Sequence, residues 1–298
     1  MANPEPTGSD ETREFYDRVG WRKQDGKVMD LHLFGVKEDG PIRIYLHNVH
    51  MERVRSALMR AGDRIKLLEC GCGGNPATNL TDLCSEYTGI DFSQVGLEEA
   101  KERLKGAAIP FEVRQADVCK LPFDNDYFDA VYSAHMLYHI PDAAAQRSAL
   151  HEMLRVVKPT GVLVLITANP RPLLFPVRLL KRLVADTPVV GSIANFMRPK
   201  PPVPYRPMPL HWYRRQMIKY GSVEFISYGL PSTAFNQCIT EYSGVGRKLW
   251  ELIRWLDVTF PQASAYLGNY VQVTVVKSVL DADLTTYMDS PKQKKIDR

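Results

Sequence analysis

The amino-acid sequence predicts an α/β fold with a doubly wound, mostly parallel β-sheet. From residue 65 onward, short apolar runs alternate with stretches of helical periodicity, which is typical of strands joined by helical crossovers. The run at 162–166 is apolar throughout, as expected of a central parallel strand buried on both faces. With 298 residues, 45% of them hydrophobic and 24% charged, the chain has a globular composition and room for one large or two small domains.

The expected strands are short apolar runs followed by turn residues or acids. The first two end at Glu69 and Asp91, and the last one alternates in polarity and is rich in β-branched residues. They comprise residues 65–69, 88–91, 111–114, 127–133, 162–167, 223–228 and 270–278.

The expected helices carry apolar residues three and four positions apart, as in Leu150, Met153, Leu154 and Val157. Ser93 is the expected N-cap of one helix, and the Lys-Pro-Thr-Gly sequence at 158–161 is expected to end another. They comprise residues 50–61, 79–86, 93–104, 142–157, 174–185, 210–219 and 246–257.

Changes in composition divide the chain into three parts. Residues 1–63 form an N-terminal extension with cap helices, 64–280 the main domain, and 281–298 a flexible tail. Within the main domain, a helical substrate cap is expected at about 169–210. Residues 171–215 contain nine Lys or Arg and a single acid, Asp186, and are rich in proline.

Charge and cysteine content exclude several protein classes. The net charge of +4 is too small to predict nucleic-acid binding. Five irregularly spaced cysteines argue against a disulfide framework and favour the cytoplasm, and Cys70 and Cys72 lack the second Cys/His pair of a zinc site, so no metal is expected. No apolar stretch resembles a secretory signal or spans a bilayer, so a soluble, cytoplasmic protein is expected.

A glycine-rich turn follows the first expected strand. Glu69-Cys70-Gly71-Cys72-Gly73 places an acid at the strand end and then glycines, which allow a tight turn and a close approach of a ligand. The dinucleotide fingerprint G-x-G-x-x-G fits poorly, because Pro76 stands where its third glycine belongs. An acid before the first glycine suits a ligand that carries a positive amine.

Three consecutive strand ends carry a carboxylate. Asp91 lies 22 residues after Glu69, in a position to accept both hydroxyls of a ribose. Asp117 and Val118 follow the third strand, where an adenine ring would lie. A single Asp after a strand is a common turn former, but all three with the glycine turn predict a nucleoside pocket at the carboxyl ends of the strands.

These motifs resemble those of the class I S-adenosylmethionine-dependent methyltransferases, most closely the small-molecule branch related to quinone-biosynthesis C-methyltransferases. The resemblance is dense over about 64–168 and weaker toward Tyr220 and Tyr270, and Thr160 stands where the family often has glycine. It implies a Rossmann-like sheet of seven strands, mostly parallel with an antiparallel last strand. The matching segments are residues 69–73, 87–93, 115–118, 121–123, 128–133, 137–142 and 154–161.

The resemblance also implies S-adenosyl-L-methionine as cofactor and a role for each residue. The glycine turn, with Gly71, Cys72 and Gly73, approaches the methionine part, and Glu69 precedes it. Asp91 holds the ribose. Phe92, Asp117 and Val118 surround the adenine, and Ser133 lies beside the sulfonium. Tyr16 either closes over the cofactor or is a plain packing residue. His135 is the best-placed general base, and His139 is the second candidate base or a residue that fixes the turn.

The expected function is methyl transfer to O or C of a bulky, apolar small molecule, with no nucleic-acid partner. The basic segment at 171–215 is either a lid for such an acceptor, a contact with an anionic membrane surface, or an ordinary cap. A nucleic-acid or protein methyltransferase is the alternative, although Ser133-Ala134-His135-Met136 replaces the Asn-Pro-Pro-Tyr type motif of amino-group methylation. A second alternative is a protein that binds S-adenosylmethionine without catalysing methyl transfer. The acceptor and the oligomeric state are not predicted.

Overall fold

The computed structural model describes residues 8–21, 23–24, 27–28, 41–173, 203–232, 235–236, 240 and 244–279. Nine strands lie in this part of the chain: β1 Lys23–Gln24, β2 Lys27–Val28, β3 Ile65–Cys70, β4 Cys84–Asp91, β5 Phe111–Gln115, β6 Phe128–Ala134, β7 Val157–Ala168, β8 Gly221–Ser227 and β9 Tyr270–Lys277. All seven expected strands are therefore confirmed, although β4 and β7 begin four and five residues earlier than expected, so that β7 includes residues 158–161. The short strands β1 and β2 were not predicted.

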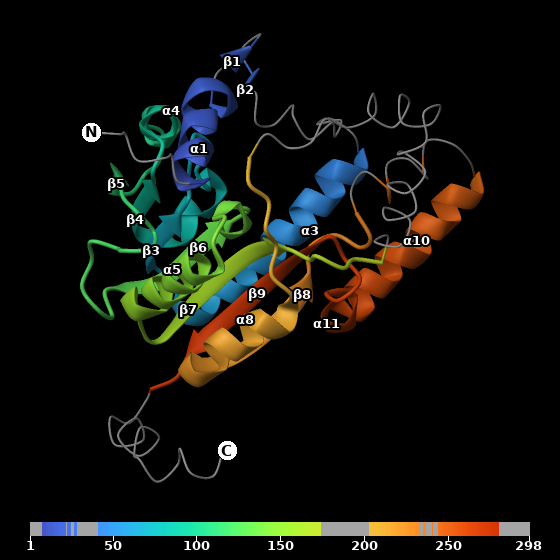
Figure 1. Cartoon of the computed structure of the whole chain (residues 1–298). Helices are drawn as coiled ribbons and strands as arrows, with labels where there is room; N and C mark the ends of the chain where they lie inside the picture. The colour runs from blue at the N-terminus through green and yellow to red at the C-terminus, as the bar shows by residue number, and fades with distance from the viewer. Residues whose placement is uncertain are drawn as a thin grey trace.

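Seven of these strands form one sheet in the order β5-β4-β3-β6-β7-β9-β8 (Figure 1). The pairs from β5 to β7 are parallel, whereas β9 is antiparallel to both β7 and β8. The predicted architecture, a mostly parallel seven-stranded sheet with an antiparallel last strand, is confirmed. β1 and β2 form a separate antiparallel pair.

Helices cover both faces of the sheet (Figure 1). The α-helices are α1 Gly8–Phe15, α3 Pro41–Leu58, α4 Gln94–Leu104, α5 Ala143–Val156, α8 Leu210–Met217, α10 Gly244–Thr259 and α11 Pro261–Ser264. Shorter turns of other helix types are η1 Tyr16–Gly20, η2 Met59–Ala61, η3 Thr78–Leu83, η4 Leu137–His139 and η5 Ile218–Tyr220. The expected helix at 174–185 and the tail at 281–298 lie outside the described residues.

Side chains alternate between two buried clusters along the strands. Leu68, Val131 and Leu163 belong to the cluster on the α5 and α8 side. Their neighbours Leu67 and Ala130 belong to the cluster on the α3 and α4 side. Because both faces of the sheet are buried, the central strands are apolar throughout, which is the pattern that the sequence showed.

The expected helix at 79–86 is wrong in its second half. Only η3 is helical there, and the chain then enters β4 at Cys84. Cys84 and Glu86 pair with Ile65 and Lys66 of β3. These main-chain hydrogen bonds to a neighbouring strand outweigh the local helical spacing.

Two helix starts follow the expected capping chemistry. The Ser93 hydroxyl accepts a hydrogen bond from the Gly96 amide at 3.1 Å, which confirms it as the N-cap of α4. Asp142 caps α5 by accepting from the Ala145 amide at 2.8 Å. α3 begins nine residues before the expected position. Pro41 lies in its first turn, where a backbone N–H would have no partner within the helix, so the missing N–H of proline costs no hydrogen bond.

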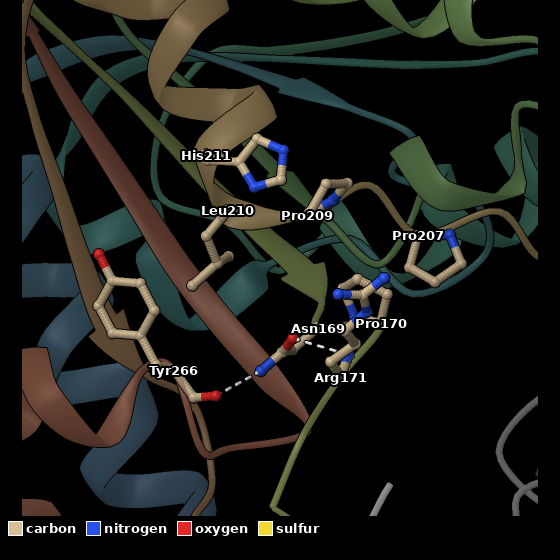
Figure 2. Close-up of a pocket in the computed structure, with 8 residues that line it drawn as sticks. All are labelled: Asn169, Pro170, Arg171, Pro207, Pro209, Leu210, His211 and Tyr266. Atoms are coloured by element: carbon tan, nitrogen blue, oxygen red, sulfur yellow. Dashed lines mark hydrogen bonds between the residues drawn. The ribbon is translucent and has the colours of Figure 1, made fainter. Parts of the chain in front are cut away.

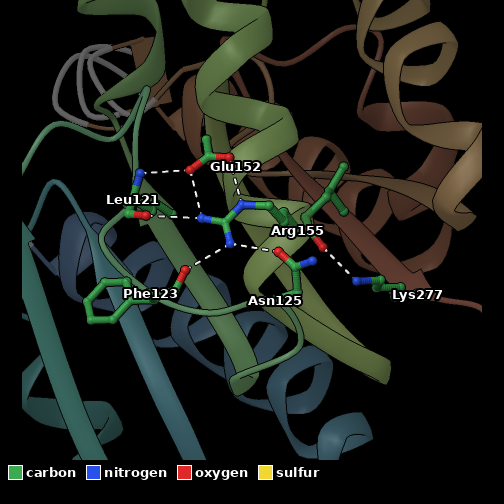
Figure 3. A network of polar contacts seen from close by, with 7 residues as sticks. Leu121, Phe123, Asn125, Glu152, Arg155 and Lys277 are labelled. Carbon is green, nitrogen blue, oxygen red and sulfur yellow. Dashed lines mark hydrogen bonds and ion pairs between the residues drawn. The ribbon is translucent and has the colours of Figure 1, made fainter.

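Arg155 of α5 fixes the loop between β5 and β6 (Figure 3). Its guanidinium donates to the carbonyl oxygens of Leu121 at 3.0 Å and Phe123 at 2.8 Å, and to Oδ1 of Asn125 at 2.8 Å. Glu152 holds the guanidinium and accepts the Leu121 amide at 2.8 Å. The segment that follows Asp117 is therefore bound to the body of the domain.

Thr160 sits in an unfavourable backbone conformation at the start of β7. Its φ is +65°, in the left-handed region that favours glycine. The next residue, Gly161, has no room for a side chain, because a Cβ there would lie 2.6 Å from the carbonyl oxygen of Asp129. Thr160 itself is exposed.

Replacing Thr160 with glycine should stabilise the fold. A β-branched residue in the left-handed region costs about 1–2 kcal/mol, and part of that gain is lost to the added freedom of glycine in the unfolded chain. We expect T160G to raise the midpoint of thermal unfolding, measured by circular dichroism. The control T259G, at the exposed end of α10, should lower it. A lower midpoint for T160G than for the wild type would contradict this account.

Candidate active site

The predicted site residues gather at one edge of the sheet. β3, β4 and β6 are parallel neighbours, so their carboxyl ends lie side by side. Glu69 lies near the end of β3, Asp91 ends β4 and Ser133 lies near the end of β6. This edge is where parallel α/β sheets bind their ligands.

The glycine turn between β3 and η3 needs its glycines. Gly71 and Gly73 have φ of +78° and +47°, in the left-handed region. A Cβ on Gly71 would meet Cγ of Met136 at 2.6 Å. The turn is tied to β4, because the amides of Gly71 and Cys72 donate to the Ile90 carbonyl at 2.8 and 3.1 Å.

Asp91 connects the glycine turn to the start of α4. Its carboxylate accepts from the Gly73 amide and from the Ser93 amide, both at 2.9 Å. Burial raises the pKa of Asp91 to about 6, against the lowering effect of these hydrogen bonds. Each oxygen carries one such bond, so lone pairs remain to accept the two hydroxyls of a ribose.

Glu69 is held beneath the same turn. The Tyr87 hydroxyl donates to its Oε2 at 2.5 Å and the Ala77 amide at 2.9 Å. Burial raises the pKa of Glu69 to about 7, the nearby Asp91 adding to the effect. Burial also raises the pKa of the Cys72 thiol well above its ordinary value, so this thiol is neutral and Cys72 contributes its backbone rather than a nucleophile.

The expected adenine-side residues lie on adjacent strand ends. Phe92 follows β4 and Asp117 follows β5, and the two strands pair up to Asp91 and Gln115. Phe92 and Val118 are partly buried, whereas Asp117 is exposed. Oδ1 of Asp117 accepts the Cys119 amide at 2.8 Å, so this carboxylate also shapes its own turn.

Ser133 acts as a brace between β6 and the glycine turn. Its hydroxyl donates to the Cys70 carbonyl at 2.8 Å and is fully buried. The donor proton of Ser133 is therefore committed to the backbone, and only its oxygen lone pairs remain for a ligand.

The N-terminal segment lies over the glycine turn. The Tyr16 ring stacks on Trp21 at 5.3 Å and presents its edge to His139 at 6.3 Å. The Trp21 indole fills the space that a Cβ on Gly73 would need, at 2.1 Å. Asp17 accepts the Ser93 hydroxyl at 2.5 Å and pins the segment to α4. Sequence reasoning found Tyr16 but missed Trp21 and Asp17, because neither belongs to a motif with characteristic spacing.

His135 stands just after β6 in a strained conformation. Its φ is +58°, and such strain in a non-glycine residue is typical of functional sites. Its Nδ1 lies 3.1 Å from the Tyr138 hydroxyl, and the rings of Tyr270 and Tyr228 lie 4.8 and 5.9 Å away. Burial lowers the pKa of His135 to about 4, so the imidazole is neutral at neutral pH.

His139, in η4, contacts the chain at Pro204. Its Nδ1 lies 2.8 Å from the Pro204 carbonyl oxygen, which only accepts, so this nitrogen carries the proton. Burial lowers the pKa of His139 as well. The contact agrees with the expectation that His139 fixes this turn.

His50, which sequence reasoning missed, joins the same cluster from α3. Its ring stacks on Tyr228 at 4.0 Å, and burial lowers its pKa to about 3. His50 and Tyr228 both lie outside the segments that carry the sequence motifs, so their position near His135 is visible only in the folded chain.

A pocket of about 380 Å³ opens beyond the end of β7 (Figure 2). Asn169 organises it: its side-chain amide donates to the carbonyl oxygens of Tyr266 and Gly268 at 3.0 Å, and its oxygen accepts the Arg171 amide at 3.0 Å. The lining is mostly apolar, with Arg171 and His211 as basic groups. Its residues are Asn169, Pro170, Arg171, Pro207, Pro209, Leu210, His211 and Tyr266.

Among the described residues, no three His, Cys, Asp or Glu side chains are grouped to hold a metal ion. No described helix has the length and apolarity needed to cross a bilayer.

Comparison with known proteins identifies the motif-bearing region. Residues 68–165 match the methyltransferase domain family. A ubiquinone biosynthesis O-methyltransferase from Alkalilimnicola ehrlichii is 37% identical over 109 residues, which is 36% of this chain and 43% of the relative. A ubiquinone/menaquinone biosynthesis C-methyltransferase from Desulfotalea psychrophila is 41% identical over 86 residues, 29% of this chain and 33% of the relative. The chain thus spans less than half the length of these relatives.

The fold also resembles that of a solved methyltransferase. The magnesium protoporphyrin IX methyltransferase of Synechocystis PCC 6803, solved with bound S-adenosyl-L-homocysteine, superimposes with a TM-score of 0.53 at 13% identity. The match covers 89% of this chain and 98% of that one. The glycine turn, Glu69 and Asp91 all lie within residues 68–165, the segment that matches the methyltransferase domain family, whose methyl donor is S-adenosyl-L-methionine.

Proposed function

We propose that this chain transfers a methyl group from S-adenosyl-L-methionine to a bulky, mainly apolar small molecule. The observation that supports it most is the buried Asp91 carboxylate, which binds the Gly73 amide at 2.9 Å at the carboxyl edge of the sheet. That arrangement offers a ribose acceptor beside the glycine turn, at the edge where parallel sheets bind their ligands.

When bound, the cofactor supplies an electrophilic methyl group. The residues of the chain do the rest. The glycine turn and Asp91 hold the donor, and the N-terminal segment with Tyr16 and Trp21 excludes water from above. Alignment of donor and acceptor is worth about 7–11 kcal/mol in such reactions.

His135 is the proposed general base for an acceptor that must lose a proton. The hydrogen bond to Tyr138 and the contact with Tyr270 fix its ring, and in the neutral tautomer whose Nδ1 donates to Tyr138 the lone pair of Nε2 takes that proton. With an oxygen acceptor, the proton of the hydroxyl passes to the imidazole while the oxygen takes the methyl group. A carbon acceptor would use the same base to remove a proton from carbon.

The pocket beyond β7 is the proposed site for the body of the acceptor. Its volume of about 380 Å³ and its prolines, Leu210 and Tyr266 suit an apolar molecule, and Arg171 suits a negative group on it. The two named relatives are an O-methyltransferase and a C-methyltransferase of quinone biosynthesis. They support a small-molecule acceptor and are consistent with methylation of either an oxygen or a carbon atom.

One experiment distinguishes the proposed function from methylation of RNA or protein and from non-catalytic binding of the donor. The protein is incubated with isotope-labelled S-adenosyl-L-methionine and separately with lipid extract, water-soluble extract, RNA and total protein, and products are identified by mass spectrometry. Label in a compound of the lipid extract supports the proposal. Label in RNA or protein would replace it, and donor binding without any transfer would indicate a non-catalytic binding protein.

The first prediction concerns Asp91 and pH. The charged carboxylate accepts ribose hydroxyls, and its pKa of about 6 means that this form appears as the pH rises through 6. Calorimetric affinity for S-adenosyl-L-homocysteine should therefore increase from pH 5 to pH 8. D91N should bind at least about tenfold more weakly at pH 8 and should lose the titration near pH 6. Wild-type affinity in D91N would refute the donor site.

The second prediction concerns His135. Because a general base contributes about 10²–10⁴-fold, H135A should lower kcat with the acceptor found above by at least that lower bound. Its affinity for S-adenosyl-L-homocysteine should stay within about twofold of the wild type, and an unchanged thermal midpoint controls for misfolding. An unaltered kcat in H135A would show that His135 only lines the site.

The third prediction concerns Arg171. R171E should raise KM for a negatively charged acceptor by at least about fivefold at low salt, with less effect at high salt because exposed charges are screened within about 8–10 Å. R215E, an equal charge reversal on the exposed side of α8, is the matched control and should leave KM unchanged. Equal effects of the two variants would mean that only overall charge matters.

A further inference from the structure

α10 carries an apolar face that no described residue covers. Val245, Leu249 and Leu252 follow one another at spacings of four and three residues, which places them on one side of the helix. Their exposed fractions are 78%, 41% and 51%, and Trp255 on the next turn is 54% exposed. We call these four residues the α10 stripe. Large apolar side chains so close together and so exposed are typical of interaction surfaces.

The opposite side of α10 is firmly attached to the domain. Arg53 of α3 forms a buried ion pair with Asp257 at 3.0 Å and donates to the carbonyl oxygens of Asp257 and Ser227. Trp250 packs its edge against Tyr45. α10 therefore lies beside α3 at the periphery of the molecule (Figure 1), and the α10 stripe is exposed on an anchored helix.

The charges around the stripe indicate the kind of partner. Arg247, Lys248 and Arg254 are exposed on the same helix together with a single exposed acid, Glu251, and Asp257 is paired with Arg53, so the exposed charges of α10 sum to +2. A basic helix with Leu, Val and Trp on one face is the composition of helices that lie in the surface of anionic bilayers. A second copy of the chain fits less well, because two helices of net positive charge would repel each other and the stripe covers only about one and a half heptads.

The apolar surface continues from α10 to the proposed acceptor pocket. Phe260 and Leu267 on either side of α11 are 49% and 43% exposed. Between them in the chain, Tyr266 is 54% exposed and also lines the pocket beyond β7. A bulky apolar acceptor dissolved in a bilayer would thus meet apolar side chains between the α10 stripe and the pocket.

We propose that the α10 stripe docks the protein on the surface of an anionic phospholipid bilayer, from which the pocket takes its apolar acceptor. The second clause rests on the proposed function, whereas the docking does not. Binding here is peripheral and reversible, and the interaction joins apolar burial of Leu249, Leu252 and Trp255 to attraction of Arg247 and Lys248 by the headgroups.

The test is co-sedimentation of the full chain with unilamellar vesicles. Vesicles of phosphatidylcholine containing phosphatidylglycerol should bind the protein, and vesicles of phosphatidylcholine alone should bind it several-fold more weakly. L249E/L252E should bind the anionic vesicles at least about tenfold more weakly, because two leucines no longer enter the interface and two negative charges replace them. The control M59E/I218E makes the same charge change at two apolar residues, each 54% exposed on other elements, and should bind like the wild type.

Two further readouts keep the outcomes distinct. Tryptophan emission should shift to the blue with anionic vesicles, and this shift should shrink in W255F. Calorimetry with S-adenosyl-L-homocysteine should give equal affinity for L249E/L252E and the wild type, so a failure of docking is separate from a failure of the methyltransferase assignment. Equal vesicle binding by the stripe and control variants would overturn the proposal, as would a dimer of the wild type that L249E/L252E dissociates.

Discussion

The parallel alignment of β3, β4 and β6 is the constraint on which the site depends. It brings three strand ends to one edge, where the Ile90 carbonyl and the Asp91 carboxylate bind the main chain of the glycine turn. These hydrogen bonds hold Gly71 and Gly73 in the left-handed conformation. Without that turn, Glu69 would lose its Ala77 partner, Trp21 would lose the surface on which it rests, and Ser133 would have no carbonyl to brace.

The site is built from two kinds of sequence. Most of the proposed donor-binding residues lie within residues 68–165, the part that matches the methyltransferase domain. The proposed acceptor side draws on residues outside it: His50 from α3 and Tyr228 after β8, near His135, and Arg171 and Tyr266 around the pocket. The two relatives of this domain are named for O- and for C-methylation, so the matched segment alone does not fix the atom that is methylated.

How far the sequence predicts this structure follows from the range of the interactions involved. The seven strands of the main sheet, the glycine turn and the Ser93 cap are local patterns, and these were predicted, whereas the short pair β1 and β2 was not. The helix expected at 79–86 was wrong because pairing between Cys84 and Ile65, which are distant in sequence, decides the conformation there. His50 and Trp21 escaped notice for the same reason, since their function comes from contacts with Tyr228 and Gly73 that no local spacing reveals.

The most direct measurement of the central claim is a nuclear magnetic resonance titration with S-adenosyl-L-homocysteine. If the donor binds at the carboxyl edge of β3 and β4, the backbone amides of Gly71, Gly73 and Ser93 should shift strongly. The amide resonance of Gly161, which lies at the opposite end of the strands, should not shift. Saturable shifts confined to the surroundings of Asn169, with the Gly73 and Ser93 amides unchanged, would contradict the account and place the ligand in the pocket beyond β7.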